Sequence, residues 1–367
     1  MKIECLKEKL ERALTLSERA TSKNPTLPVL SYVLLEAAGN SLVLRSTNLD
    51  IGIEITLPVK VEKAGAVAIK AGTLLGFLTS APKDRNITLE SSEGGLLVKT
   101  LGGEALVKTV GFDDFPSMSK VSTGSGVVLD AALLSVGIRS VAYSASISHI
   151  KPELASVVIY GEGKNMVFVS TDSFRLAEKK IKADLHKDIE RTIIPIKNAV
   201  ELARIAEEME MEKVNVYLGK NQIALEGAGI YFVSRVVDGT FPDYKQIIPK
   251  EWKTEVVALK EDFARAIKTA TVFSDAFNQT TVSVSPTKKK MEFKAKNADV
   301  GEGAIAISGA ISGEAMDISF NHRYLSDCLQ SIVSDSVSMS FSGENRPTMI
   351  RGVSDTSFLY IVMPMNR

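Results

Sequence analysis

The chain has 367 residues, with 44 Lys plus Arg and 44 Asp plus Glu, so its formal net charge is zero. An apolar content of 45% is enough for real hydrophobic cores and excludes an intrinsically disordered chain. The length suits about two or three ordinary domains. Overall charge gives no indication of nucleic-acid binding, which would require basic residues gathered on one surface.

Cysteine and histidine are too sparse for a disulfide framework or a metal site. The two cysteines, Cys5 and Cys328, lie far apart, and the three histidines are scattered. This usage suits a reducing compartment. The N-terminus lacks the apolar segment of a signal peptide, and no run approaches the roughly 18 apolar residues of a membrane span. We therefore expect a soluble, cytoplasmic protein with no metal, no cofactor and no membrane contact.

The first third of the chain reads as two helices among many strands. Leu6, Leu10, Ala13 and Leu14 recur at helical spacing, and the helical pattern ends before Pro25. A second helix is expected over residues 71–80. Strands separated by Gly or Asn turns are expected over residues 29–37, 42–45, 51–61, 87–89, 96–100 and 105–110. This segment closes with Phe115-Pro116.

The same order of elements then occurs twice more. Helices are expected over residues 129–145 and 196–209, and again from Leu259 and over 323–332. The second segment closes with Phe241-Pro242, and Pro364 stands at the matching place near the chain end. The remaining apolar runs predict strands over residues 154–160, 166–170, 213–217, 223–226, 231–236, 281–284, 291–294, 303–308, 337–341, 348–352 and 358–363.

One short motif recurs in all three segments. The stretch from Phe168 to Ala177 is a β-rich run, a polar Asp172-Ser173 turn and the start of a second strand. Residues 44–51 and 293–300 have the same form. The long-period repeat, the excess of strands and the short turns predict an α+β protein with antiparallel sheets. We place the domains at residues 1–121, 122–249 and 250–367.

Basic residues recur on the predicted helices. Lys9, Arg12 and Arg19 lie on one flank of the first helix, and Arg265 matches Arg12 in position. The other repeated helices add Arg139, Lys197 and Arg204. A charged helix face is most often only solvated. Recurrence at matched positions instead favours one basic surface in an otherwise neutral molecule, as duplex DNA would require.

Catalytic signatures are missing from the sequence. The glycines fall in hairpin turns, with no phosphate-binding Gly-rich loop, and no nucleophile motif is present. Asp113-Asp114 is a possible carboxylate pair for a metal, but the third segment has no Asp at the matching place. We therefore expect a protein that is not an enzyme.

With these motifs in hand, the chain resembles the bacterial DNA sliding clamps, the beta subunits of DNA polymerase III, over its whole length. The most specific segments are residues 25–30, 170–177, 237–244 and 360–365. The resemblance implies three clamp domains, each with two helices packed on antiparallel sheets, and half of a closed ring per chain. It implies a processivity factor whose homodimeric ring encircles and slides on double-stranded DNA.

The resemblance also implies a peptide-binding pocket that receives DNA polymerase III, other polymerases and the clamp loader. Its residues carry over to Leu154, Thr171, Ser173, Phe174, Arg175, Leu176, Pro242, Gln246, Ile247, Pro347, Ile361, Val362, Met363, Pro364 and Met365. Methionine suits a surface that accepts several ligands. The family often has Gly-His-Arg at Ser173-Phe174-Arg175, and basic residues where Asn24 and Asn366 stand.

The DNA-facing positions and the dimer contacts complete the expectations. The DNA-facing set is Lys9, Arg12, Arg19, Lys23, Arg139, Lys197, Arg204 and Arg265. A head-to-tail contact is expected between the 105–110 strand, including Leu106, and Val272 with Phe273 of a second copy. A repeat-type protein scaffold with no DNA in the channel is the alternative that the sequence leaves open.

Overall fold

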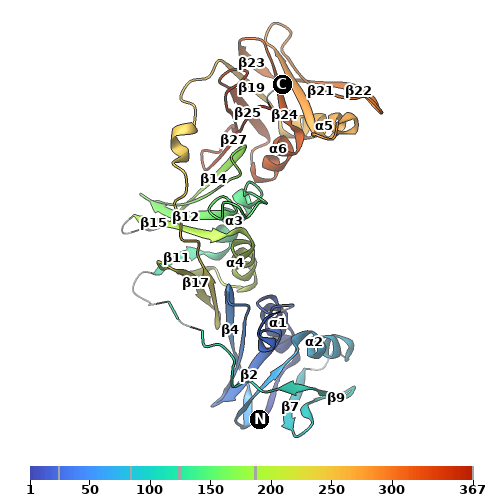
Figure 1. The fold of residues 1–367 in the computed structure, drawn as a ribbon, viewed down its shortest axis with the longest axis vertical. Coiled ribbons are helices and arrows are strands. Elements are labelled where there is room, and N and C mark those ends of the chain that lie inside the picture. Colours follow the sequence, from blue (N-terminus) through green and yellow to red (C-terminus); the bar gives the residue numbers. More distant parts are fainter. Residues whose placement is uncertain (24, 83–84, 119, 122–125, 186–187, 366–367) are drawn as a thin grey trace. The chain divides into compact units, whose positions relative to one another are not determined.

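The structure is a computed structural model that describes residues 1–23, 25–82, 85–118, 120–121, 126–185 and 188–365. Asn24 and Asn366, two positions where the chain departs from the clamp pattern, lie outside this range. The chain forms two compact units, the first made of residues 1–135 and 201–236 and the second of residues 136–200 and 237–367. Figure 1 shows the helices and strands of the chain, coloured along the sequence.

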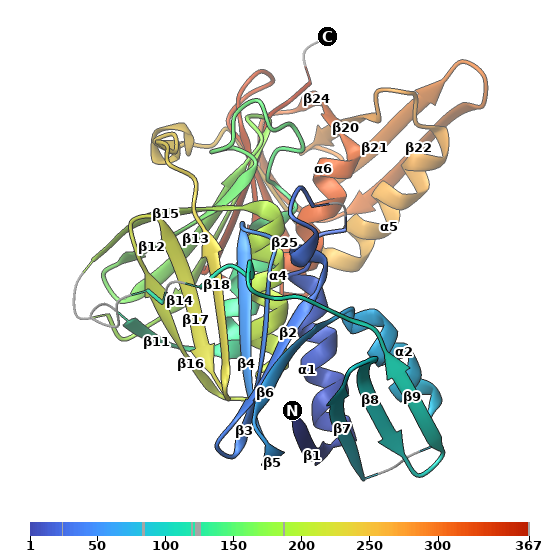
Figure 2. The ribbon, with the colours of Figure 1, turned by 60° about the horizontal axis from the view of Figure 1, so that its bottom comes forward.

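The first unit contains two antiparallel sheets. One has five strands in the order β5-β1-β7-β8-β9, and the other has nine in the order β10-β6-β2-β3-β4-β18-β17-β16-β11. Its elements are β1 (Lys2–Leu6), α1 (Lys7–Arg19), the 3-10 helix η1 (Pro28–Ser31), β2 (Val33–Ala38), β3 (Ser41–Thr47), β4 (Ile51–Pro58), β5 (Lys60–Lys63), β6 (Gly65–Ile69), α2 (Ala71–Ser80), β7 (Asn86–Ser92), β8 (Gly95–Thr100), β9 (Gly103–Val107), β10 (Thr109–Val110), β11 (Gly126–Asp130), β16 (Lys213–Leu218), β17 (Gln222–Gly227) and β18 (Ile230–Arg235). Helix α1 packs against α2 and against β3 and β4 (Figure 2).

The second unit repeats this plan with sheets of nine and four strands. Their orders are β15-β12-β13-β14-β27-β26-β25-β19-β23 and β22-β21-β20-β24. Helices α3 (Ala131–Ala142) and α4 (Ile196–Glu208) contribute residues to both units. The other elements are β12 (Ser156–Glu162), β13 (Asn165–Thr171), β14 (Arg175–Lys182), β15 (Ile189–Pro195), the 3-10 helix η3 (Tyr244–Ile247), β19 (Thr254–Leu259), α5 (Lys260–Ala270), η4 (Thr271–Phe273), β20 (Gln279–Ser285), β21 (Lys290–Asn297), β22 (Gly301–Ser308), β23 (Ala310–Gly313), β24 (Met316–Asn321), α6 (His322–Asp327), η5 (Cys328–Ser331), β25 (Ser336–Phe341), β26 (Thr348–Gly352) and β27 (Phe358–Val362).

The repeats predicted from the sequence are joined through their sheets. In the first unit, β4 of the first repeat pairs with β18 of the second, with Ile53 opposite Phe232. In the second unit, β14 of the second repeat pairs with β27 of the third, with Leu176 opposite Ile361. The two junctions use strands at equivalent places in the repeats. Each junction therefore merges two smaller sheets into one nine-stranded sheet.

The recurring motif occupies the same turn in each repeat, between β3 and β4, β13 and β14, and β21 and β22. In all three the first Asx side chain accepts backbone N–H bonds: Asn48 Oδ1 from Asp50 at 3.0 Å, Asp172 Oδ1 from Phe174 at 2.9 Å, and Asn297 Oδ1 from Asp299 at 2.9 Å. Such side-chain bonds replace missing backbone partners in a tight turn. The sequence repeat is thus a repeat of turn chemistry.

Helical apolar stripes were predicted more accurately than element boundaries. Phe263, Ala266, Ile267 and Ala270 are all buried on α5, as expected. Leu6, however, ends β1 and is 37% exposed, because a short strand precedes the first helix of each repeat. The expected 29–37 strand begins with η1, where Pro28 fixes the backbone, and only Val33–Ala38 is extended. The expected 51–61 strand is two strands, β4 and β5, that lie in different sheets.

Candidate functional site

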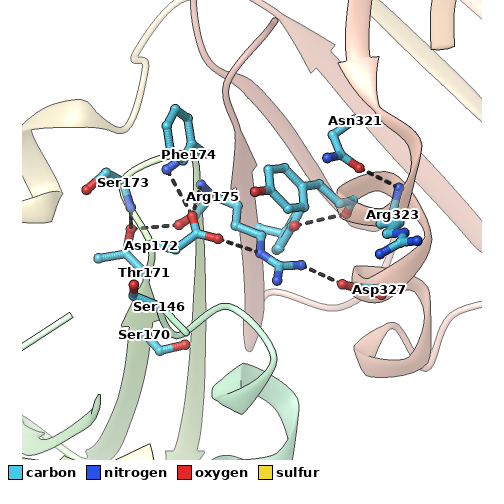
Figure 3. A network of polar contacts seen from close by, with 12 residues as sticks. Ser146, Ser170, Thr171, Asp172, Ser173, Phe174, Arg175, Asn321, Arg323 and Asp327 are labelled. Atoms are coloured by element: carbon cyan, nitrogen blue, oxygen red, sulfur yellow. Dashed lines mark hydrogen bonds and ion pairs between the residues drawn. The ribbon is translucent and has the colours of Figure 1, made fainter. Parts of the chain in front are cut away.

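The β13–β14 turn presents a bulky side chain to solvent from a constrained backbone. Ser173 has a φ of 77°, a left-handed conformation that costs free energy for a residue other than glycine. Asp172 Oδ1 accepts the backbone N–H groups of both Phe174 and Arg175 at 2.9 Å, and Thr171 Oγ1 accepts the N–H of Ser173 at 3.2 Å. These bonds hold the strained turn (Figure 3), and Phe174 is left 61% exposed.

The C-terminal tail attaches to this turn by backbone hydrogen bonds. β27 pairs with β14 so that Val362 lies opposite Arg175. One step further on, the Met363 N–H donates to the Phe174 carbonyl at 2.8 Å, and the Met365 N–H donates to the Ser319 carbonyl at 2.8 Å. Met363, Pro364 and Met365 are half-buried, and Phe174 is exposed. Two stretches about 190 residues apart, both expected in the pocket from the sequence, therefore lie side by side.

Arg175 joins the turn to α6. Its Nε lies 3.0 Å from Asp172 Oδ2 and its Nη1 lies 2.5 Å from Asp327 Oδ2 (Figure 3). The guanidinium lies 4.4 Å from the centroid of the Tyr324 ring. Burial works to lower the pKa of Arg175, but Tyr360 and the carboxylates of Asp327 and Asp172 outweigh it and raise the pKa. The residue is therefore a permanent, desolvated charge with two carboxylate partners.

Arg175→Ala is expected to destabilise the protein by about 3 kcal/mol, because it leaves Asp172 and Asp327 facing each other across an emptied, largely buried site. Urea unfolding of the variant measures this loss. Arg351→Ala is the matched control, since Arg351 is exposed on β26 and has no ion pair with any described residue. Equal unfolding midpoints for the two variants would show that the Arg175 network contributes nothing to stability.

An apolar floor lies beneath the turn and the tail. Leu154, Leu176 and Ile361 belong to one buried cluster, which the linker residues Phe241 and Tyr244 complete. The Tyr244 hydroxyl donates to Glu178 and lies 2.7 Å from the Tyr160 hydroxyl, and burial raises the pKa of Tyr244. This buried bond fixes the linker against the sheet.

The remaining pocket residues lie around this floor. Pro242, Gln246 and Ile247 are exposed on or beside η3, with Ile247 48% exposed, and Pro347 directly precedes β26. The structure thus gathers the sequence-predicted residues on β14, β27 and the linker of one unit. Sequence reasoning missed Asp327, Tyr324 and Ser319, which hold Arg175 and the tail. No spacing or motif marks these three, because only tertiary packing brings them to the turn.

The expected DNA-facing residues lie on the solvent side of their helices. Lys9, Arg12 and Arg19 are on α1, opposite the buried Leu10 and Leu14. The other members of the set are also exposed or half-buried. They are Lys23 after α1, Arg139 on α3, Lys197 and Arg204 on α4, and Arg265 on α5. These basic side chains are thus in contact with solvent within each helix.

The expected contact residues between copies lie at sheet edges. β9 is the last strand of the five-stranded sheet, and Leu106 on it is 56% exposed. Val272 and Phe273 lie in η4, not in a strand. Phe273 packs over β22, the last strand of the four-stranded sheet, so closely that a Cβ at Gly303 would lie 2.4 Å from its ring. Val272 is 62% exposed.

No metal or redox chemistry emerges from the residues that the structure describes. They include no group of three or more His, Cys, Asp or Glu side chains placed to hold a metal ion. Cys5 and Cys328 are both buried free thiols, and burial raises the pKa of Cys5 to about 12. Over the same part of the chain, no helix has the length and apolarity to cross a membrane.

Comparison with known proteins identifies the fold and the family. The DNA polymerase III beta subunit family matches in three parts, its N-terminal domain over residues 1–119, its central domain over 128–243 and its C-terminal domain over 245–366. The Beta sliding clamp of Synechococcus elongatus is 27% identical over 371 residues, which are 100% of this chain and 99% of that protein. The Beta sliding clamp of Bacillus subtilis is 25% identical, again over 100% of this chain and 99% of its own. The crystal structure of the DNA polymerase III subunit beta from Pseudomonas aeruginosa is 25% identical, has a TM-score of 0.94 and covers 100% of both chains. The chain therefore belongs to the DNA polymerase III beta subunit family and has its three-domain clamp fold.

Proposed function

We propose that this protein is the processivity factor of a DNA polymerase, a homodimeric ring that encircles duplex DNA, slides along it and tethers the polymerase. The ring is not itself an enzyme, and it acts in the cytoplasm. Its domains are residues 1–121, 122–249 and 250–367. Processivity follows from topology and tethering, because a tethered polymerase meets the primer end at high effective concentration.

The proposal rests on the two smaller sheets, which each end in an edge strand with no second partner among the described residues. Both junctions between repeats form nine-stranded sheets, whereas the two remaining sheets have five and four strands. The edge strands of these two sheets are β5 and β9 in one and β22 and β24 in the other. Of these, β9 and β22 occupy the places in their repeats that β18 and β4 occupy in the first junction. A free strand edge is a template for pairing. Pairing β9 with β22 of a second copy completes a third sheet of the same kind, and a second such contact closes a head-to-tail dimer.

The DNA-facing set is Lys9, Arg12, Arg19, Lys23, Arg139, Lys197, Arg204 and Arg265. These helix residues attract phosphates without reading bases, so the attraction is independent of sequence and falls with salt. A closed ring needs no tight grip, since topology keeps it on the DNA. The same reasoning sets the scaffold alternative aside, because a scaffold has no use for basic residues repeated on equivalent helices.

The β13–β14 turn, the tail and the linker form the docking groove for polymerases and the clamp loader. Phe174, Ile247 and the Met363–Met365 tail offer apolar contacts around a buried floor. An extended peptide with two or three apolar anchors fits such a surface. A dissociation constant on the order of micromolar, roughly 8 kcal/mol, lets partners exchange.

Primer extension tests this function directly. With its own clamp loader and polymerase on a primed circle, the protein is expected to lengthen the products of single binding events. Omitting the loader should remove the gain, because the closed ring then cannot reach the circle. Products of the same length with and without the protein would contradict the proposal.

Charge reversal at Arg12 or Arg204 is expected to weaken retention on DNA, most strongly at low salt, where phosphate attraction is least screened. Each substitution removes one phosphate contact and adds a repulsion. Retention of loaded rings on circular DNA across a salt series measures the effect. Arg351→Glu, on a strand outside the DNA-facing set, is the matched control. Losses no greater than the control's would remove Arg12 and Arg204 from the set.

A further inference from the structure

We infer that the carboxylates of Glu201, Glu208, Glu210 and Asp262 compete with DNA phosphates for four arginines of the DNA-facing set, Arg12, Arg19, Arg204 and Arg265, and so keep the ring's hold on DNA weak. The inference rests on the proposed function, in which those arginines face DNA. It goes further by proposing that acidic residues determine how strongly the ring binds DNA.

Arg12 already has two anionic partners. Its Nη1 lies 2.7 Å from Glu210 Oε2, and its Nε lies 3.8 Å from Glu208 Oε2. Glu208 is the last residue of α4 and Glu210 follows the helix, and their side chains are 50% and 75% exposed respectively. Ion pairs this exposed contribute little to stability and open readily. A phosphate can therefore replace either carboxylate, but only by competing with it.

Glu201 lies between two arginines. Its Oε2 is 3.7 Å from Arg19 Nη1 on α1, and its Oε1 is 3.7 Å from Arg204 Nη1 on α4. These separations are too long for hydrogen bonds, and Oε2 is a buried oxygen without a hydrogen-bond partner. One carboxylate thus partly neutralises two cations without saturating either. Both guanidinium groups keep donors available for a phosphate.

Within the DNA-facing set, four arginines have ion-pair partners among the described residues and the lysines do not. Arg265 pairs with Asp262 one turn earlier on α5. Lys9, Lys23 and Lys197 have no ion pair with any residue that the structure describes. Arginine binds phosphate through a rigid two-pronged contact, whereas lysine is a mobile point charge. Arg12, Arg19, Arg204 and Arg265, which can bind a phosphate tightly, therefore have acidic partners, whereas these three lysines have none that the structure describes.

This arrangement suits a ring that must move. Each fully available cation adds one released counterion and raises the salt dependence of binding, with a slope of about −0.9 per phosphate contact. A carboxylate that reoccupies the arginine as the phosphate leaves lowers the cost of each step along the DNA.

The test removes carboxylates without removing arginines. Glu210→Gln and Glu201→Gln are made in the full-length dimer, and binding to a labelled linear duplex is measured across a salt series. The expected result is tighter binding at low salt and a steeper slope. The slope should change by up to about 0.9 for Glu210→Gln, because Glu208 remains beside Arg12, and by up to about 1.8 for Glu201→Gln, which frees two arginines. Glu210 is a surface residue, so its variant retains the fold even if Glu201→Gln loses stability.

Two controls separate local pairing from overall charge. Glu62→Gln makes the same charge change on β5, where Glu62 pairs with Lys2 at 3.0 Å, and is expected to leave the slope unchanged. The effect of Glu210→Gln should vanish in an Arg12→Gln background.

The outcomes of the two proposals are distinct. If Glu210→Gln and Glu201→Gln behave as Glu62→Gln does, or if the Arg12→Gln background does not matter, the carboxylates do not compete and the inference is wrong. The proposed function stands in either case provided that charge reversal at Arg12 or Arg204 weakens retention. If that reversal also has no effect, the DNA-facing set itself is wrong.

Discussion

Removing residues 363–367 is expected to abolish stimulation of the polymerase while leaving the dimer intact. The deletion ends the chain after Val362, so β27 keeps its pairing with β14 and β26. It removes the Met363 bond to Phe174 and the Met365 bond to Ser319, and with them the apolar side of the groove. Primer extension on a loaded circle and sedimentation together measure the two properties.

A point substitution tests the same docking groove without shortening the chain. Phe174→Ala is expected to weaken partner binding by about tenfold or more, as truncation of a central aromatic anchor does. Phe277→Ala is the matched control, since Phe277 is an equally exposed aromatic, at 73%, before β20. If the shortened protein still stimulates synthesis normally, or if Phe174 and Phe277 behave alike, the docking groove lies elsewhere.

Leu106→Asp is expected to convert the dimer to monomers, and Phe273→Asp should do the same from the other side of the contact. Leu106 is 56% exposed in a single chain, so a charged residue there should not disturb the fold of that chain. The charge becomes unfavourable only when β9 pairs with β22 of a second copy. Burying an unpaired carboxylate in each of two symmetric contacts then costs several kcal/mol. Sedimentation at fixed protein concentration gives the molecular mass.

Val333→Asp is the control for this experiment, because Val333 is 81% exposed and lies away from both edge strands in the sequence. The Leu106 variant matters most, since Phe273 packs on β22 within one chain and its loss affects local structure as well. A Leu106→Asp protein that sediments as an unchanged dimer would place the contact between copies on another surface.

The sequence predicted repeated and local features well. The stripe of α5 follows from four apolar residues at helical spacing, and all four are buried. The three matched turns follow from Asx residues whose side chains cap the backbone locally. Both signals depend only on residues a few positions apart, which is why reading a single chain reveals them.

Contacts between distant segments were predicted only through the family resemblance, or not at all. Pairing of Leu176 with Ile361 joins two strands of ordinary β pattern, and no property of either strand selects the other. The Arg175 bond to Asp327 depends on that pairing and on the position of α6. The short strands before each first helix were missed because their few apolar residues merge with the helical stripe that follows, as at Leu6.

The central claim is that the ring holds DNA by enclosing it. Rings loaded on a nicked circle are separated from free protein, and the fraction retained is measured before and after the circle is linearised. If the ring encloses DNA, it is expected to stay on the circle and to be lost rapidly from the linear ends, at a salt concentration where direct binding is weak. Equal retention on both forms would contradict enclosure and would point to ordinary binding to phosphates or a groove.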